Sequence, residues 1–398
     1  MTKLLIQHGP AKGQKIQVAL DKKISDGVVF SPREEKIESI KDYCNSVQIL
    51  NKDNIYIDPQ FYYSTYNKDF AKLLDGQFNY PVEISRRDCR KNKETIYEYF
   101  DKYVEAVQPI SNNIITPGFS IEAIDWKFDY SIDFYNDFKE RYNFKRYYLS
   151  LMLSSKIFHS KNDTEDILED LKENIEEKDG IYLIINHIPS QDNNYDSIDP
   201  ETLSNIMYFI YTLKKENINI IVGYTFLNSI LYAMLDCEAI ASGWFNKLRK
   251  FDQNRFENVE TYGKRKKRYF SIPSLTYMTI ELINEFKNDI DISILYSNTF
   301  CDKIALEDED NVSFVDLEQQ YWEALFNVLS EINQKETIEE KIKLVKTMIS
   351  KAREILEIIM NVTHTKEVVQ DKVKNSFKHI DDWGFAIELF EKKASLLL

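Results

Sequence analysis

Glycine is scarce in this sequence, with 10 residues in 398, whereas about 7% is usual for soluble proteins. Neither of the glycine-rich patterns that hold phosphate groups, Gly-x-x-x-x-Gly-Lys and Gly-x-Gly-x-x-Gly, occurs in it. These absences argue against P-loop nucleotide hydrolases and dinucleotide-binding folds, and we expect the protein to use no cofactor.

Clustered cysteines and long apolar runs are also missing. The four cysteines lie far apart, at positions 44, 89, 237 and 301, so neither a zinc ribbon nor a disulfide framework is indicated and no metal is expected. No apolar run reaches membrane-spanning length, the run at residues 181–185 has the length of a strand, and residues 1–17 lack the apolar core of a secretion signal. We therefore expect a soluble, cytoplasmic protein with reduced thiols and no membrane partner.

What the sequence does contain is an alternation of short apolar runs and longer amphipathic stretches. Strands are predicted at 27–31, 54–58, 113–116, 147–154, 181–187, 218–225 and 239–244, with an eighth at 269–272 or 292–297. Helices are predicted at 33–45, 131–141, 164–178, 200–216, 227–236 and 275–287. Strands that are apolar on both faces and alternate with helices favour an α/β fold of the (β/α)8 TIM-barrel class.

The pattern changes near residue 315 to helix alone. Apolar residues recur every three or four positions from Ile338 to Ile359, and helices are predicted at 316–332, 336–361 and 366–394. We therefore expect a catalytic barrel over 1–314 and a C-terminal helical region over 315–398. Residues 61–108 are too many for one crossover connection, so an insertion is predicted there.

Charge is distributed unevenly along the chain. The net charge of −14 argues, as an average, against a nucleic-acid-binding protein, but residues 247–268 carry +6 and residues 86–93 carry +4. Both segments are predicted to follow strands, on the active face of a barrel, and aromatic residues are interleaved in the first. A solvated loop is the alternative interpretation. The candidate phosphate-binding residues are Arg86, Arg87, Arg90, Lys91, Lys247, Arg249, Lys250, Arg255, Lys264, Arg265, Lys266, Lys267 and Arg268.

Polar residues at the carboxyl ends of barrel strands are the default catalytic candidates. Asp58 follows the apolar run Ile-Tyr-Ile, although it could instead be a turn or helix cap. His187 ends a strand and could equally be structural, and Asp125 could be either an acid–base group or a helix-start charge. Ser242 also ends a strand, but it lacks the Gly-x-Ser-x-Gly context of a hydrolase nucleophile.

Residues 219–225 (Asn-Ile-Ile-Val-Gly-Tyr-Thr), Leu231 and residues 235–244 (Leu-Asp-Cys-Glu-Ala-Ile-Ala-Ser-Gly-Trp) form a strand–helix–strand pattern. This pattern resembles the late unit of the tRNA-guanine transglycosylase superfamily, including its DNA-directed relatives. The strand end Asp58-Pro59-Gln60 resembles the early aspartate of that family, which contacts the target base. Two departures are clear: Ser242 stands where the family's nucleophilic aspartate would fall, and the Cys-x-Cys-x-x-Cys zinc site is absent.

The resemblance implies an enzyme that acts on a base flipped out of DNA. Because the nucleophile is missing, water would capture the sugar, and the modified base would be removed from DNA to leave an abasic site, plausibly in defence against phage. In this hypothesis Asp58 polarises water or the sugar, the basic segments bind phosphates, and the residues expected to line the base pocket are Gln60, Phe61, Tyr62 and Trp244.

Three alternatives stay open from the sequence. The first is base exchange that inserts a deazaguanine-type base into DNA or RNA. The second is a nucleic-acid-binding subunit without catalysis that uses the C-terminal helices to hold a partner. The third is a barrel enzyme that acts on a small molecule.

Overall fold

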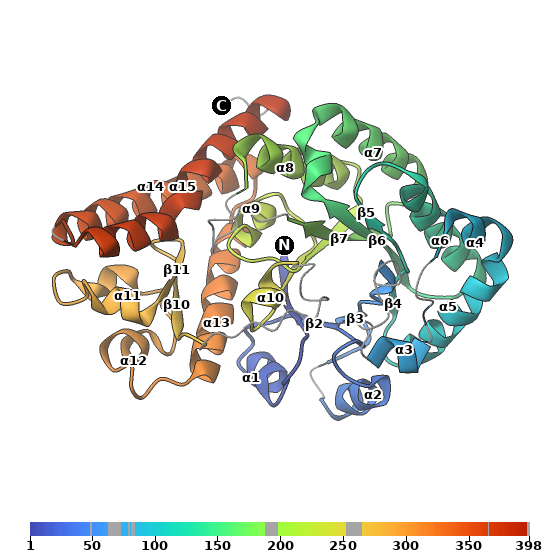
Figure 1. Cartoon of the computed structure of the whole chain (residues 1–398), viewed down its shortest axis with the longest axis horizontal. Coiled ribbons are helices and arrows are strands. Elements are labelled where there is room, and N and C mark those ends of the chain that lie inside the picture. Colours follow the sequence, from blue (N-terminus) through green and yellow to red (C-terminus); the bar gives the residue numbers. More distant parts are fainter. Residues whose placement is uncertain are drawn as a thin grey trace.

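Eight parallel strands form a nearly closed barrel surrounded by helices (Figure 1). The computed structural model describes residues 1–47, 50–62, 73–78, 80, 84–187, 198–251, 265–364 and 366–395. The barrel strands are β1 (Lys3–Gln7), β2 (Gly27–Phe30), β3 (Ile55–Ile57), β4 (Asn113–Ile115), β6 (Arg146–Ser154), β7 (Gly180–Asn186), β8 (Asn219–Gly223) and β9 (Ala239–Ser242). A short strand, β5 (Ser120–Ile121), pairs with the distal part of β6. The predicted (β/α)8 class is confirmed.

The eighth strand is not where the sequence placed it. It is β1, which pairs with β2 on one side and with β9 on the other. Residues 269–272 overlap β10 (Arg268–Ser271), which forms a separate antiparallel hairpin with β11 (Thr276–Thr279). Residues 292–297 begin with a 3-10 helix, η5 (Ile292–Leu295), because Asp291 caps that turn by accepting a hydrogen bond from the Ser293 amide. Both predicted positions were therefore wrong.

The register of the strands fixes which side chains face the lumen. Side chains alternate between the two faces of a strand, and register partners share a face. Tyr182 on β7 is paired with Ser150 on β6 and with Ile221 on β8, two residues before Gly223. The same face continues from Ile221 through Ala239 and Ala241 on β9 and Leu5 on β1 to Gln7. Ser242 alternates with Ala241 and therefore faces outward.

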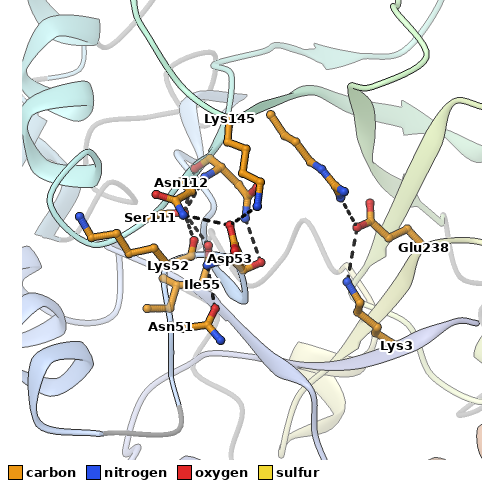
Figure 2. A network of polar contacts seen from close by, with 11 residues as sticks. Lys3, Asn51, Lys52, Asp53, Ile55, Ser111, Asn112, Lys145 and Glu238 are labelled. Carbon is orange, nitrogen blue, oxygen red and sulfur yellow. Dashed lines mark hydrogen bonds and ion pairs between the residues drawn. The ribbon is translucent and has the colours of Figure 1, made fainter.

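Side chains complete the barrel between β3 and β4. The Ser111 hydroxyl donates to the Ile55 carbonyl at 2.6 Å, and the Asn112 amide side chain donates to Asp53 at 2.9 Å. Lys145 reaches the same Asp53 carboxylate at 3.0 Å, as Figure 2 shows. At the carboxyl ends of these two strands, the Tyr103 hydroxyl lies 2.8 Å from the Ile57 carbonyl and 2.9 Å from the Ile115 carbonyl. Polar side chains thus link the two strands that end the ladder.

At the amino-terminal end of the lumen, polar side chains gather around Glu238. Glu238 accepts hydrogen bonds from the Tyr148 hydroxyl at 2.8 Å and from Arg146 at 3.0 Å. Lys3 lies 3.7 Å from the same carboxylate (Figure 2). The opposite end, where the carboxyl ends of the strands lie, is called the mouth below.

Most of the predicted helices are present. The barrel helices are α1 (Lys15–Asp21), α2 (Ile37–Ser46), α6 (Trp126–Arg141), α7 (Lys161–Asn174), α8 (Pro200–Lys215) and α9 (Ser229–Met234). Asp199 caps α8 by accepting from the Thr202 amide, with Pro200 in the first turn. The helix predicted at 275–287 was only partly right, since this segment comprises β11 followed by α11 (Ile280–Asn284).

The region between β3 and β4 contains α3 (Leu73–Phe78), α4 (Arg86–Lys91) and α5 (Lys93–Val107). After β9 the chain forms α10 (Asn246–Arg249), the β10–β11 hairpin, α11, α12 (Asp302–Glu307) and then α13 (Phe314–Asn333). α13 packs on β1 and α9, and so covers the part of the barrel where the first and last strands meet. The long helices α14 (Ile338–Val362) and α15 (Glu367–Lys393) extend to one side, in red in Figure 1.

Candidate functional site

Asp58 lies at the mouth, immediately after β3, and its side chain is fully buried. The Tyr62 hydroxyl donates to Asp58 Oδ2 at 2.9 Å, and the Gln60 backbone amide donates to Asp58 Oδ1 at 3.0 Å. The hydroxyls of Tyr182 and Tyr224 lie 3.3 Å and 3.5 Å from Oδ2. A carboxylate removed from water is thus surrounded by hydrogen-bond donors from β7, from the end of β8 and from its own loop.

Gln60 and Tyr224 adopt a conformation that is unusual for residues other than glycine. Both have φ near +53°, where a side chain crowds the backbone and costs about 1 kcal/mol. Their side chains meet, because Gln60 Nε2 donates to the Tyr224 hydroxyl at 3.3 Å. The Ser31 hydroxyl, at the end of β2, donates to Gln60 Oε1 at 2.8 Å. The strained residues are therefore fixed by polar contacts with each other and with a neighbouring strand end.

The Tyr182 ring crosses the lumen to reach Asp58. Its hydroxyl lies between Asp58 Oδ2 and Gln7 Oε1, 3.2 Å from the latter. Gly223 makes room for it, since a Cβ at Gly223 would lie 2.6 Å from Tyr182 Oη. Burial, together with the nearby Asp58 charge, holds the pKa of Tyr182 well above its usual value, so the phenol stays protonated.

Two buried polar atoms in this lumen have no hydrogen-bond partner among the described residues: Gln7 Nε2 and Ser150 Oγ. Gln7 and Ser150 share the lumen face with Tyr182. A buried donor or acceptor that is left unsatisfied costs about 1–3 kcal/mol. We refer below to Asp58, Gln7, Gln60, Tyr62, Tyr182 and Tyr224 as the Asp58 cluster.

Phe251 covers the Asp58 cluster. Its ring centroid lies 5.8 Å from that of Tyr62 and 5.5 Å from that of Tyr224. Its backbone forms an isolated parallel bridge with Asn186 at the end of β7. Phe251 is 2% exposed and Tyr224 is 5% exposed, so the cluster is shut off from solvent in this conformation.

A second polar group, which the sequence gave no reason to expect, lies beside the mouth at the end of β1. The Ser31 backbone amide donates to His8 Nδ1 at 3.3 Å, so Nε2 is the nitrogen that donates to Glu35, at 3.1 Å. Lys12 binds the other Glu35 oxygen at 2.8 Å. Burial lowers the pKa of His8, so this imidazole is neutral. Burial alone would raise the pKa of Glu35, but the hydrogen bonds from His8 and Lys12 outweigh it and lower the pKa to about 2.

Ser242 and Trp244 lie outside the lumen. Ser242 Oγ donates to the Thr225 carbonyl at 2.6 Å and lies 2.8 Å from the Tyr321 hydroxyl of α13. The Trp244 indole donates to the Pro10 carbonyl and packs edge-on against His8 and Trp322. Both residues connect β9 to the elements around it.

The other candidates lie at scattered positions. Tyr62 and Gln60 belong to the Asp58 cluster, whereas Phe61 is fully buried among Tyr80, Phe100, Phe119 and Phe134. Asp125 is exposed and is the N-cap of α6, where it accepts from the Lys127 amide. His187 is half-buried at the mouth, directly after β7.

The basic residues near position 90 lie on a helix, where the sequence predicted a loop. α4 begins with a Ser85–Asp88 capping box and contacts α5 and α6. Because α5 leads into the amino end of β4, the start of α5 and the preceding α4 lie toward the mouth. Four cations of α4 are exposed and form what we call the α4 basic face: Arg86, Arg87, Arg90 and Lys91.

The basic segment from 247 to 268 does not form one surface. Arg249 is buried, Lys250 is half-buried, and Arg265 forms an ion pair with Glu318 while lying over Phe314. Lys266 is exposed, Lys267 donates to the Glu309 carbonyl at 2.7 Å, and Arg268 begins β10. Arg255, Lys264 and the side chain of Lys247 lie outside the described parts of the chain.

The functional candidates that sequence reasoning missed are Gln7, Tyr182 and Tyr224 in the Asp58 cluster. Tyr182 stands within the apolar run 181–185 and Tyr224 follows Gly223, so both look like core residues in the sequence. The one signal in the sequence that points to such residues is a polar side chain at the end of a strand. Gln7 ends β1 and would have been selected in this way if β1 had been predicted.

No three His, Cys, Asp or Glu side chains in the described ranges are grouped so that they could hold a metal ion. The helices in those ranges include none long and apolar enough to cross a membrane. Comparison with protein-family models, with curated proteins and with solved structures found no match to this chain.

Proposed function

We propose that this protein is a DNA glycosylase-like enzyme that removes a modified base from DNA and leaves an abasic site, as in defence against phage. The observation that carries the proposal is the Asp58 cluster. It is a buried carboxylate at the barrel mouth, held by tyrosine hydroxyls and accompanied by the unpaired atoms Gln7 Nε2 and Ser150 Oγ. Such atoms are the kind that read the polar edge of a flipped base.

The tRNA-guanine transglycosylase resemblance supports the assignment of Asp58, since the family's base-contacting aspartate corresponds to this strand end. Hydrolysis is favoured over base exchange by the orientation of Ser242. The residue at the nucleophile position, Ser242, faces away from the lumen, with its hydroxyl bonded to Thr225 and close to Tyr321. A covalent intermediate on that side chain would require β9 to turn its outer face inward.

In the reaction that we propose, water adds to C1′ of the sugar while the C1′–N bond breaks. The electrons of that bond leave with the base, and the positive charge that develops on the sugar is stabilised by the Asp58 carboxylate. The carboxylate accepts a proton from the attacking water and then gives that proton to the leaving base, so the hydroxyl remains on C1′, the base leaves neutral and the carboxylate is regenerated. Tyr182, whose raised pKa keeps it protonated, holds Asp58 Oδ2 in position.

Two basic features support DNA as the substrate. The α4 basic face is exposed, and exposed cations of this kind bind the DNA backbone without sequence preference. Lys266 adds an exposed cation after β9. In a chain of net charge −14, these are local exceptions that would orient a polyanion toward the barrel mouth.

The test is incubation of the protein with phage DNA that carries modified bases, followed by chromatography of released base and cleavage at abasic sites. We expect Asp58→Asn to lower base release by about 10²- to 10⁴-fold. Asp53→Asn is the matched control, since it alters a half-exposed carboxylate at the other end of β3. We expect its base release to stay within about threefold of wild type, far less than the loss of a general acid–base group would cause.

Intact DNA with the wild-type protein, or undiminished release by Asp58→Asn, would overturn the assignment. Incorporation of a labelled free deazaguanine-type base into DNA or RNA would instead indicate base exchange. Salt-sensitive DNA binding without chemistry on any modified substrate would indicate a binding subunit.

A further inference from the structure

Arg249, the last residue of α10, is an arginine in the interior of the protein. It is 1% exposed, and its Nε donates to the Gly243 carbonyl at 2.8 Å. Nη1 and Nη2 are both buried and have no hydrogen-bond partner among the described residues. Arginine is almost never fully buried unless it is paired, so its environment needs an explanation.

Three aromatic rings surround this guanidinium. Its central carbon lies 3.5 Å from the ring centroid of Tyr321, 4.7 Å from that of Tyr277 and 5.8 Å from that of Phe226. The rings also contact one another, with Phe226 and Tyr321 stacked at 6.0 Å. They come from the end of β8, from β11 and from α13, so the box is assembled from barrel and C-terminal elements.

Cation–π contacts explain only part of this arrangement. Aromatic rings stabilise the charge through the faces of the guanidinium, but they offer no acceptor to the N–H bonds at its edge. No carboxylate in the described ranges forms an ion pair with Arg249, whereas nearby Arg265 is paired with Glu318. The parallel N–H bonds of such an edge are the group that binds phosphate oxygens in a bidentate manner.

We infer that Arg249 binds a phosphate-type oxyanion through its Nη edge, in a subsite beside the barrel mouth. The position fits the proposed reaction, on which the choice of a DNA phosphate rests. Phe251, two residues further along the chain, lies on the Asp58 cluster, and Phe226 follows Tyr224 by two residues. An anion on Arg249 would therefore be next to the nucleotide whose base enters the lumen.

The same chemistry could serve a backbone phosphate of DNA or a free phosphate ion, and binding measurements separate the two. They are made in the Asp58→Asn background, so that no base is released during the measurement. The probes are inorganic phosphate, a short oligodeoxynucleotide and the same oligonucleotide with uncharged methylphosphonate linkages. Arg249→Lys keeps the charge but loses the fork, and Arg249→Gln removes both.

For a DNA phosphate, we expect each Arg249 variant to weaken oligonucleotide binding by about tenfold and to reduce the slope of log affinity against log salt by about 1. The methylphosphonate oligonucleotide should bind equally to all of them. The control is Arg353→Gln, which removes a half-exposed arginine paired with Asp381 on the C-terminal helices. It should leave the affinity unchanged.

A free-phosphate subsite would instead show phosphate-dependent thermal stabilisation that Arg249→Gln abolishes, with unaltered oligonucleotide binding. Crystals of the wild-type protein grown with selenate give a readout that does not depend on the folding of a variant. An anomalous selenium peak within hydrogen-bond distance of Arg249 Nη1 or Nη2 is expected. No peak there, together with no effect of Arg249→Lys on either probe, would overturn the inference. Base release by an Arg249 variant at the wild-type rate and affinity would remove the DNA role and leave the glycosylase proposal standing.

Discussion

Replacing Gly223 by alanine tests the geometry of the Asp58 cluster with a single methyl group. The added carbon would lie 2.6 Å from Tyr182 Oη and 2.8 Å from Tyr182 Cζ, closer than nonbonded atoms can approach. The Tyr182 ring must then move and lose its contacts with Asp58 and Gln7. Overpacking costs about 1–3 kcal/mol, and a lost hydrogen bond to a charged group costs about 1.5–3 kcal/mol. We expect the free energy of unfolding to fall by about 2.5–6 kcal/mol in total.

The Tyr182→Phe variant separates these two contributions. It removes the hydroxyl, and with it the hydrogen bonds and the oxygen atom that lies closest to the new methyl group. By itself it should cost about 2 kcal/mol, because it leaves Asp58 with one donor fewer. In the double variant the hydrogen bonds cannot be lost twice, so the two effects should fall short of their sum by about 1.5 kcal/mol or more.

The assay is urea denaturation followed by tryptophan fluorescence and by circular dichroism, whose transitions must coincide before a free energy is derived. Gly76→Ala is the matched control, since a Cβ there meets nothing within 4 Å, and helix propensity predicts a gain of up to about 1 kcal/mol. If Gly223→Ala proves neutral, or if its effect adds to that of Tyr182→Phe within about 0.5 kcal/mol, then Tyr182 does not occupy the space over Gly223 and our description of the cluster is wrong.

Three further outcomes are expected. Burial lowers the pKa of His379 to about 4, so between pH 6.5 and 4 the unfolded chain binds a proton that the folded chain does not. The free energy of unfolding therefore falls as the pH falls, by about 2 kcal/mol between pH 7 and 5. In urea titrations, the free energy of unfolding of His379→Gln should depend on pH less than that of wild type by this amount. Ser242→Ala should lower stability by about 1–2 kcal/mol but retain base release, and a folded variant without release would contradict our placement of Ser242 outside the lumen. Replacing the four cations of the α4 basic face by glutamine should reduce the slope of log DNA affinity against log salt by about 3. The comparison is replacement of exposed lysines of α15, namely Lys372, Lys374 and Lys378. An equal reduction of the slope by the α15 replacements would count against a DNA role for α4.

The sequence predicted the barrel class because its evidence is local. Apolar strands, capped helices and the three long C-terminal helices are each visible within one segment of the chain. β1 was missed because it has five residues and a lysine at its start, and only pairing with β2 and β9 identifies it as the closing strand. Residues 269–271 do lie within a strand, but local pattern cannot say which sheet a strand joins, and β10 pairs with β11 in a hairpin of its own.

The sequence selected Asp58 and its neighbours Gln60 and Tyr62, whereas the partners that are distant in sequence were missed for the same reason. Asp58 is conspicuous because a carboxylate directly follows an apolar strand. Tyr182 and Tyr224 reach it from positions 124 and 166 residues away, and nothing near them in the sequence indicates that their hydroxyls meet a carboxylate. Phe61 and Trp244 were expected in a base pocket, but aromatic residues are also the largest core residues, and both pack as such.

The Asp58 cluster is difficult to explain as a contribution to stability. A TIM-barrel lumen is ordinarily filled by branched apolar side chains, whereas this one buries a carboxylate, two glutamines and a serine. Gln60 and Tyr224 add about 1 kcal/mol of backbone strain each, and Gln7 Nε2 and Ser150 Oγ add about 1–3 kcal/mol each as unsatisfied groups. An apolar lumen would avoid the cost of the buried and unsatisfied polar groups without changing the barrel. Strained and unsatisfied groups concentrate at functional sites, where a ligand supplies the missing partners. The energetic cost of this lumen therefore supports placing the proposed reaction here, with Asp58 as the group that would perform it.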